Sequence, residues 1–322
     1  MVRGLDWRPG ATLAVARLRA RVLQRIRQYF GRTQALEVET PSLVREAVTD
    51  VHIESLRVTG PDGQSMGNLH TSPEYAMKRL LCAGWPDIYQ VAHVFRGGER
   101  GRRHSPEFTM IEWYRLGIDH HALMDDVERL IFEALSPETA PTASQRIAYR
   151  EAFIGALSLD PFDCSTQALH RALENAGQPV PRSLKGKRDA LLDIALSTSV
   201  TASFPRDRLT FLYDFPASQA ALARTRGPLA SRFEAFWGDI ELANGFHELT
   251  DVAEQARRFE ADLASRHSQG QCQPGVDRLL LAALSSGLPD CSGVALGFDR
   301  LLMIAAGVEH IDEVSSFPFE RA

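Results

Sequence analysis

The feature that most constrains the fold is a pair of alternating, largely apolar stretches separated by a short basic loop. Residues 88–96 and 107–115 each have the pattern of a strand, and the intervening GGERGRRHSP holds too much glycine and arginine to pack as core. This pattern predicts a long antiparallel hairpin with a basic tip. The two-residue period of a strand places Phe108, Glu112 and Tyr114 on one face of the second stretch.

The loop of this hairpin has the chemistry of a phosphate-binding site. Arg96 ends the first strand, and the loop after it carries Arg100, Arg102, Arg103 and His104. A guanidinium group can grip phosphate oxygens through two parallel hydrogen bonds. Phe108 could then support a nucleotide base. The same pattern also fits an exposed basic loop above an ordinary amphipathic strand.

A second predicted hairpin brings carboxylates together. The dipeptide Gly238-Asp239 is a two-residue turn signal between the strands RFEAFW and IELANGFHEL. With that turn, Phe236 faces Glu241 across the ladder, and Glu234 lies diagonally beside Glu241 on the same face. Like charges in this position repel unless a cation lies between them, and magnesium, which binds one or two carboxylates plus phosphate oxygens, suits the position. Glutamates on a solvated sheet face are the alternative.

Glu248 follows in the same strand but has the opposite parity to Glu241. A bulge at Asn244-Gly245 would return Glu248 to the face of Glu241, as a separate anionic site. A carboxylate deep in a cleft is suited to bind an ammonium group.

The C-terminal region reads as a strand, CSGVALG, followed by a glycine turn and a helix that Gly307 ends. Gly293 and Gly297 in the strand allow close backbone approach to a ligand. Arg300 adds positive charge to the already positive N-terminus of the helix, an unfavourable choice that a bound phosphate would explain.

The rest of the chain supplies the frame of these segments. Residues 12–30 form an amphipathic helix whose arginine face is either solvated or contacts a partner. The extended segment LEVETPSL follows and ends at Pro41. The stretch from about 136 to 210 is polar and punctuated by prolines, which predicts a helical insertion without site chemistry.

These segments together resemble the three signature motifs of class II aminoacyl-tRNA synthetases: the extended segment ending at Pro41, the FR-loop-HxPEF hairpin and the GxxxGxDR strand and helix. TSPEYAMKRLL, HSPEFTMIEWY and ELANGFHELTD resemble the lysine-specific enzymes. FPASQAALA and the terminal SSFPFERA resemble one offshoot, the elongation factor P lysine ligases. The resemblance implies an α+β fold, an antiparallel sheet flanked by helices, in one catalytic domain over residues 1–322 without an anticodon-binding OB-fold.

The resemblance also assigns roles to residues. Arg96 and Arg300 would hold the α- and γ-phosphates as the catalytic pair, and Glu234 with Glu241 would bind Mg²⁺. The ATP site would comprise Arg96, Glu99, His104, Ser105, Phe108, Glu241, Leu242, Gly297 and Arg300. The amino-acid site would comprise Ser72, Pro73, Glu74, Glu112, Tyr114, Asn244, Phe246, Glu248 and Ala295. The chain departs from the usual FRNEE and HNPEF at Gly97, Gly98 and Ser105, and Glu99 stands in after a loop shift.

Ala295 lies where similar lysyl-tRNA synthetases have a third glycine. Its methyl group should face the amine on the substrate backbone, so we expect it to disfavour α-lysine and to tolerate β-lysine.

The implied activity is activation of (R)-β-lysine or lysine by ATP and transfer to a lysine of elongation factor P, by a homodimer built across the segment ending at Pro41. The alternatives are a truncated lysyl-tRNA synthetase-like enzyme and a non-catalytic regulator. A formal charge of -5 gives no general attraction to tRNA or to an anionic membrane. We expect a cytoplasmic protein, because no stretch reaches the roughly 20 apolar residues of a membrane span. The four scattered cysteines indicate reduced thiols.

Overall fold

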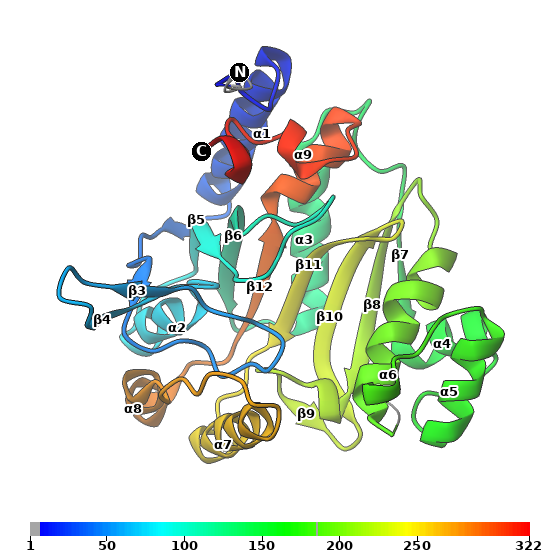
Figure 1. Cartoon of the computed structure of the whole chain (residues 1–322). Coiled ribbons are helices and arrows are strands. Elements are labelled where there is room, and N and C mark those ends of the chain that lie inside the picture. Colours follow the sequence, from blue (N-terminus) through cyan, green and yellow to red (C-terminus); the bar gives the residue numbers. More distant parts are fainter. Residues whose placement is uncertain (1–6, 185) are drawn as a thin grey trace, which may run out of the picture.

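A nine-stranded sheet organises the computed structural model, which describes residues 7–184 and 186–322 (Figure 1). Its strands, in spatial order, are β1 (Leu36–Glu37), β5 (Ile88–Phe95), β6 (Glu107–Leu116), β12 (Cys291–Gly297), β11 (Ile240–His247), β10 (Leu229–Trp237), β8 (Leu209–Pro216) and β7 (Ser144–Ala148), with β9 (Thr225–Arg226) beside β10. Neighbours are antiparallel except at the two edges, where β1 with β5 and β7 with β8 are parallel. The predicted α+β fold is confirmed, and so is the hairpin of β5 and β6.

One face of the sheet is covered by three helices, α1 (Leu13–Arg32), α3 (His120–Ala134) and α9 (Phe298–Ala306). Helix α1 begins at Thr12, whose hydroxyl accepts a hydrogen bond from the backbone N–H of Val15. Its buried side chains, Val22, Ile26, Tyr29 and Phe30, follow the helical period and form one core with α3, α9 and the strands. The amphipathic helix predicted for residues 12–30 is therefore confirmed.

The opposite face is only partly covered. At one end lie α2 (Glu74–Cys82), α7 (Val252–Ser268) and α8 (Arg278–Gly287), with the small sheet of β2 (Leu43–Val44), β4 (Ser65–Leu69) and β3 (Arg57–Thr59). At the other end lie α4 (Tyr149–Leu157), α5 (Thr166–Asn175) and α6 (Arg188–Ala195). Short turns complete the chain: η1 (Arg182–Leu184), η2 (Leu196–Val200), η3 (Thr201–Ser203), η4 (Ala217–Gln219), η5 (Ile311–Glu313) and η6 (Phe319–Arg321).

The prediction for residues 136–210 was wrong in one respect, because the segment contains a strand of the main sheet. Strand β7 pairs in parallel with β8 and forms the sheet edge. Its five residues, SQRIA, are too short to show a strand period, so the pairing depends on the surface that β8 offers. The helices after it enclose an apolar core around Tyr149, Phe153 and Leu192.

The hairpin of β10 and β11 has the predicted turn but a different bulge. Trp237 pairs with Ile240 and Phe236 with Glu241, which leaves Gly238 and Asp239 as the turn. Ala235 then pairs with Ala243, so the extra residue is Leu242 and not the predicted Asn244-Gly245. Gly245 serves packing instead, because a Cβ there would lie 2.4 Å from the ring of Phe233.

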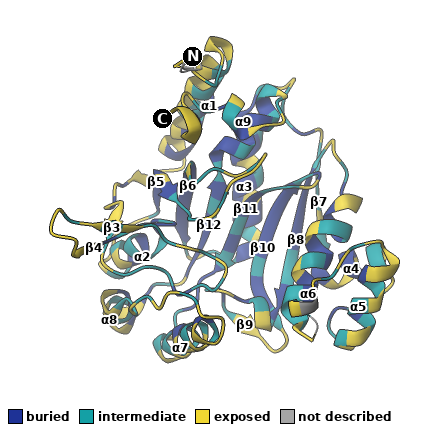
Figure 2. Ribbon diagram, viewed as in Figure 1, coloured by how far each residue is buried: buried dark blue, intermediate teal, exposed yellow. Residues whose placement is uncertain are grey.

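Burial follows these layers: the central strands of the large sheet are mostly buried, whereas the short strands β1, β3 and β9 and the outward faces of the helices are more exposed (Figure 2). Among the described residues, no helix has the length and apolarity that crossing a membrane requires. The four cysteines are free thiols.

A buried carboxylate, Asp126 of α3, joins three elements. It accepts hydrogen bonds from the Trp113 indole at 3.0 Å, from the Arg115 guanidinium at 2.8 Å and from the Tyr29 hydroxyl. Only 5% of Asp126 is exposed. Its charge is therefore paired where water cannot solvate it, and the contact links α1, β6 and α3.

We predict that Asp126→Asn lowers the free energy of unfolding by up to about 3–5 kcal/mol. The Arg115 guanidinium loses its buried charged partner, and among the described residues it keeps only the longer, 3.3 Å ion pair with the half-buried Asp87. Urea unfolding followed by circular dichroism measures this change. Asp125→Asn is the matched control, since Asp125 is exposed and, within the described part of the chain, pairs only with Arg146. That variant should change stability by less than about 1 kcal/mol. Equal effects of the two substitutions would contradict the role given to Asp126.

Candidate active site

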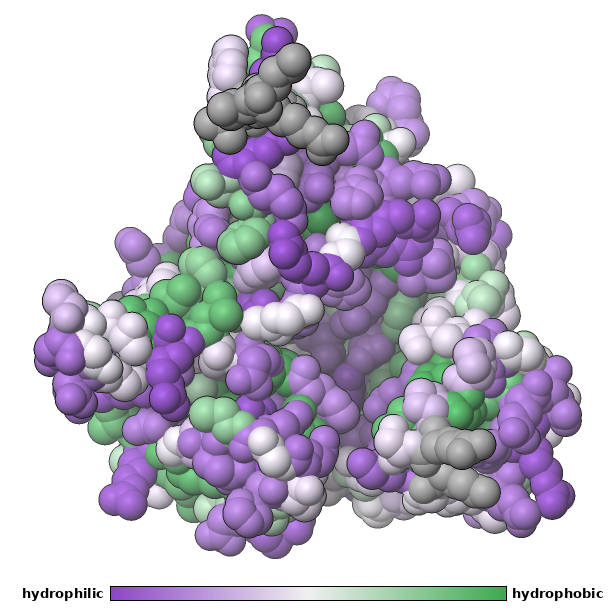
Figure 3. Space-filling view, in the orientation of Figure 1, coloured by the Kyte–Doolittle hydropathy of each residue, from purple (hydrophilic) through white to green (hydrophobic). Residues whose placement is uncertain are grey.

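The candidate site lies on the partly covered face of the sheet, over β6, β12, β11 and β10. Space-filling representation shows a hydrophilic hollow on this face (Figure 3). Antiparallel pairing aligns its residues across strands, because Ala295 is opposite both Glu112 and Asn244, and Gly293 is opposite both Tyr114 and Phe246. Directly paired residues share a face of the sheet.

Glu112 and Tyr114 of β6 form the floor of one half of the hollow. The Tyr114 hydroxyl donates to Glu112 Oε1 at 2.8 Å, and the Ser72 hydroxyl donates to Glu112 Oε2 at 2.7 Å. Ser72 precedes α2 and also accepts a hydrogen bond from the backbone N–H of Glu74 at 3.0 Å. Pro73, between them, is the N-cap residue of α2. The start of α2 is thereby fixed against β6.

Lys78 of α2 occupies the centre of this half. Its ammonium lies 2.6 Å from a carboxylate oxygen of Glu74 and 2.6 Å from Glu248 Oε2. Lys78 and Glu248 are 2% and 1% exposed. Glu248 Oε1 has no hydrogen-bond partner among the described residues. The Lys78 ammonium therefore lies between the carboxylates of Glu74 and Glu248, and the carboxylate of Glu112 is joined to the start of α2 through Ser72.

Two buried carboxylates in this half carry an electrostatic cost. Burial raises the pKa of Glu112 to about 7, with a further contribution from the charge of Glu74. Burial raises the pKa of Glu248 to about 8, although the neighbouring Lys78 opposes the shift. The pocket is thus poised to bind additional positive charge.

Gly293 makes room for this arrangement. A Cβ at that position would lie 2.3 Å from the Tyr114 ring and 2.6 Å from Glu248 Oε1. Any larger residue would displace both side chains. Gly297 has no such constraint, since a Cβ there would make only ordinary contacts.

The other half of the hollow pairs carboxylates with arginines. Arg232 donates a hydrogen bond of 2.5 Å to Glu234, and it also reaches the Asn244 side chain at 3.3 Å. Burial raises the pKa of Glu234 to about 7; Arg232 lowers this pKa and the charge of Glu241 raises it. Arg300 lies 3.6 Å from the Glu241 carboxylate and donates to the Glu241 backbone carbonyl at 3.0 Å. Glu234 and Glu241 lie on the same face of the hairpin, because Glu241 pairs with Phe236, two residues after Glu234.

The basic loop contributes Arg96 and His104 to this half. The Arg96 guanidinium lies over the Phe108 ring at 5.2 Å from its centroid and 3.5 Å from Glu99. Its Nε is buried without a hydrogen-bond partner among the described residues. Burial, and after it the charge of Arg300, lowers the pKa of His104, whose Nε2 is 2.9 Å from Arg300. The loop thus joins the hollow at Arg96, Glu99 and His104.

Three other arginines of the loop are paired with carboxylates away from this hollow. Arg100 pairs with Glu320, Arg102 with Glu309 and Arg103 with Asp239. Gly97 donates a 2.7 Å hydrogen bond to the carbonyl of Glu54, and a Cβ on Gly97 would lie 3.2 Å from the Glu54 side chain. Gly97, where the chain departs from the usual loop sequence, therefore packs closely against Glu54.

The remaining predicted residues fall into two groups. Asn244, Phe246 and Ala295 lie on the strands of the hollow, and Ala295 is partly buried beside Phe108. Ser105 lies between His104 and the start of β6, and its hydroxyl makes no hydrogen bond with any other described residue. Leu242 packs its side chain into the core beneath α1 and α3, so only its backbone can face a ligand.

Sequence reasoning did not identify Lys78 and Arg232. Lys78 stands four residues after Glu74, the spacing at which helix side chains meet, and this signal could have identified it. Arg232 stands two residues before Glu234 on the same strand, which indicates a shared face. Both cations neutralise carboxylates that the sequence had left unpaired.

Comparisons with known proteins agree with this architecture. The family of class II tRNA synthetases (D, K and N) matches residues 2–321. Proteins named "Elongation factor P--(R)-beta-lysine ligase" are similar over 98% of this chain. The protein from Vibrio cholerae is 44% identical to this chain, and the alignment spans 99% of its length. The proteins from Yersinia enterocolitica and Proteus mirabilis are 44% and 42% identical, and the alignment spans 98% of the length of each.

The raised pKa of Glu112 predicts a pH dependence of stability. The folded state binds the proton of the Glu112 carboxyl more tightly than the unfolded state does. Glu112 therefore contributes its full share to the free energy of unfolding below pH 4.5, and this share is lost as pH rises through about 7. Wild-type protein without ligands should therefore lose stability relative to Glu112→Gln between pH 5 and 8, by up to about 3 kcal/mol at about 1.4 kcal/mol per pKa unit.

Chemical denaturation at a series of pH values measures this difference. Glu260→Gln is the control, because Glu260 on α7 is exposed and has no ion pair among the described residues. That variant should keep the wild-type pH profile. If Glu112→Gln also keeps it, Glu112 is ionised in the folded protein at neutral pH and the assigned shift is wrong.

Proposed function

We propose, because this chain belongs to the class II tRNA synthetases (D, K and N), that it activates (R)-β-lysine with ATP and joins it to a lysine side chain of elongation factor P. The observation that carries the proposal is the cluster of three carboxylates, two of them buried, beside Lys78. The printed name of the relatives gives the amino acid and the acceptor protein. Family membership implies the use of ATP.

The charge of the pocket favours a diamino acid. With all groups ionised, Glu74, Glu112 and Glu248 carry three negative charges and Lys78 one positive charge, which leaves two negative charges uncompensated. An amino acid with one ammonium group would neutralise one of them. Both ammonium groups of a lysine-type substrate would neutralise both, at a site where burial makes the uncompensated charge costly.

Glu248 is the best partner for the side-chain ammonium. It is the most deeply buried of the three carboxylates, and its free Oε1 lies above the space that Gly293 leaves open. Glu112 and Tyr114, further along the same face, would hold the other amine. Lys78 would remain as the resident counter-charge between Glu74 and Glu248.

The chemistry needs no nucleophile from the protein. The substrate carboxylate oxygen attacks the α-phosphorus of ATP, and the bond to pyrophosphate breaks. The amine of the acceptor lysine then attacks the carbonyl carbon, an amide bond forms, AMP leaves and the amine loses a proton. Arg96 and Arg300 would neutralise phosphate charge, and Phe108 would stack on the base, so the enzyme contributes position and electrostatic stabilisation.

Glu234 and Glu241 fit a magnesium ion. Burial, and with it the charge of Glu241, raises the pKa of Glu234 although Arg232 opposes the shift, so a bound cation would stabilise the ionised carboxylate. Carboxylates plus phosphate oxygens are the usual ligands of Mg²⁺, which would shield the charge of the phosphates. Arg232 would then hold Glu234 in place from the side of Asn244.

The proposal extends to assembly and location. We place a homodimer interface at the segment ending at Pro41, in a cytoplasmic enzyme. This segment lines a cavity of about 660 Å³, and Leu43 in it is 40% exposed. Sedimentation at micromolar concentration should give a dimer, and a strict monomer would contradict this part of the proposal.

ATP–pyrophosphate exchange with wild type and Glu248→Gln tests the proposal. The wild type should exchange only when lysine-type amino acids are present. Glu248→Gln should weaken amino-acid binding by about 2–5 kcal/mol, because a desolvated ammonium loses its charged partner, and should leave the KM for ATP unchanged. Glu107→Gln, an exposed site, should match the wild type. Absence of exchange in the wild type would indicate a non-catalytic regulator, and equal losses for ATP and amino acid would make Glu248 structural.

Ala295→Gly tests the choice between α- and β-lysine. Directly paired with Glu112 and Asn244, Ala295 presents its methyl group on the face of the pocket. Overpacking by one methyl group costs about 1–3 kcal/mol, so removing it should raise kcat/KM for L-α-lysine relative to (R)-β-lysine by roughly 10- to 200-fold. Ala243→Gly, on the opposite face of β11, should not change the ratio of the two constants. An unchanged ratio in Ala295→Gly would exclude Ala295 as the selector.

A further inference from the structure

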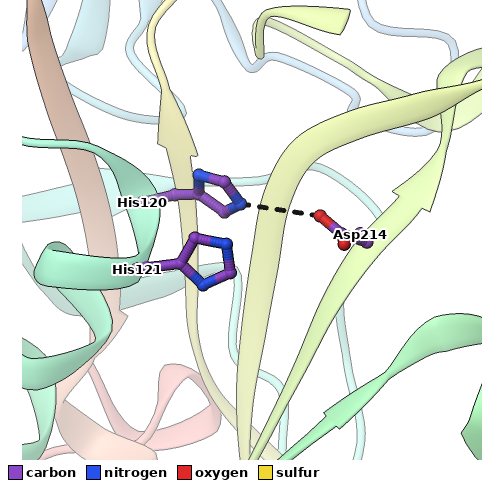
Figure 4. Close-up of side chains that lie close together, drawn as sticks. All are labelled: His120, His121 and Asp214. Atoms are coloured by element: carbon purple, nitrogen blue, oxygen red, sulfur yellow. Dashed lines mark ion pairs between the residues drawn. The ribbon is translucent and has the colours of Figure 1, made fainter. Parts of the chain in front are cut away.

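A second cluster of chemically active side chains lies away from the hollow, where α3 begins beside β8. His120, His121 and Asp214 each direct a ring nitrogen or a carboxylate oxygen toward a common point, and these atoms lie within 4.8 Å of one another (Figure 4). His120 Nε2 and Asp214 Oδ1 are 3.7 Å apart. The two imidazole rings have their centroids 4.2 Å apart.

His120 is the observation that points to a ligand. It is 2% exposed, and neither of its ring nitrogens has a hydrogen-bond partner among the described residues. The separation from Asp214 is too long for a hydrogen bond. A buried imidazole without a hydrogen-bond partner destabilises the folded state. A bound cation would satisfy the nitrogen that faces Asp214.

The backbone holds all three residues in place. The Asp119 side chain caps α3 by accepting a 2.9 Å hydrogen bond from the N–H of Ala122, so both histidines lie in a fixed first turn. Asp214 has a left-handed backbone, with φ of 59°, where the pairing of β8 with β10 is irregular. The guanidinium of Arg146, whose charge reaches His121, is paired with Asp125.

We propose that His120, His121 and Asp214 form a binding site for a divalent transition-metal ion of the zinc class. Two imidazoles and one carboxylate suit such ions, whereas Mg²⁺ and Ca²⁺ prefer oxygen ligands alone. Zinc bonds of about 2.0–2.2 Å in a tetrahedral site place ligand atoms about 3.3–3.6 Å apart, so small side-chain rotations complete the geometry. The exposed side chain of His121 leaves a fourth position for water.

The proposed ion would link a helix on the covered face of the sheet to a strand beside those of the hollow. It would join the start of α3 to β8 at Asp214, opposite the irregular part of β10 that contains Ser231 and Arg232. Arg232 is the partner of Glu234 in the candidate active site. The ion would therefore stabilise the backbone behind one wall of that site. The proposal is independent of the function proposed above.

Titration of chelator-treated, full-length protein with Co²⁺, followed by competition with Zn²⁺, tests the site. The wild type should bind a single equivalent, with visible absorption bands of cobalt in a nitrogen and oxygen environment, and Zn²⁺ should abolish these bands. His121→Ala should weaken binding at least about tenfold, because even the loss of an outer-shell partner has an effect of that size. Asp214→Asn should do the same.

His170→Ala is the matched control, since His170 lies on α5 and pairs with Glu174 outside the cluster. It should bind Co²⁺ as the wild type does. The exposure of His121 makes its alanine variant safe for folding, which circular dichroism verifies. The proposal is overturned if the wild type binds no Co²⁺, or if His121→Ala and Asp214→Asn bind it as tightly as the wild type.

Discussion

The constraint on which the rest of the structure depends is a cluster of three carboxylates, two of them buried, beside the ammonium group of Lys78. Glu74 and Glu248 reach Lys78 from a helix and from a strand, and Glu112 reaches the start of that helix through Ser72. The fold holds these negative charges out of water although burial raises the pKa values of Glu112 and Glu248. A positively charged substrate would offset this cost when it binds, and pKa shifts of this kind are typical of functional sites.

The sheet makes this concentration of charge possible. Antiparallel pairing aligns β6, β12 and β11, and Gly293 in the middle strand leaves space for Tyr114 and Glu248. Glu241 pairs with Phe236 and so shares the face of Glu234, and the bulge at Leu242 brings Asn244 and Phe246 onto the same face. On the other side, Asp126 fixes α3 and α1 against β6. The helices on the covered face thus support the strands that carry the candidate site.

Most of the fold could be predicted because its signals are local. The hairpin of β5 and β6 has a clear two-residue period, and Gly238-Asp239 defines a turn, so both were predicted with correct pairing. Strand β7 was missed because five residues carry no period of their own. The bulge was predicted at Asn244-Gly245 but lies at Leu242. The sequence does not reveal that Gly245 is needed for packing against Phe233. Partners distant in the chain, such as Lys78 with Glu248 and His120 with Asp214, depend on tertiary structure.

The central claim is that the charged pocket prepares a lysine-type amino acid for transfer to a protein. Intact-mass measurement of elongation factor P and of candidate tRNA, each incubated with this protein, ATP, Mg²⁺ and (R)-β-lysine, tests it most directly. The account predicts that elongation factor P gains the mass of one lysyl residue while the tRNA is unchanged. Unmodified elongation factor P, or a charged tRNA in its place, would contradict the account.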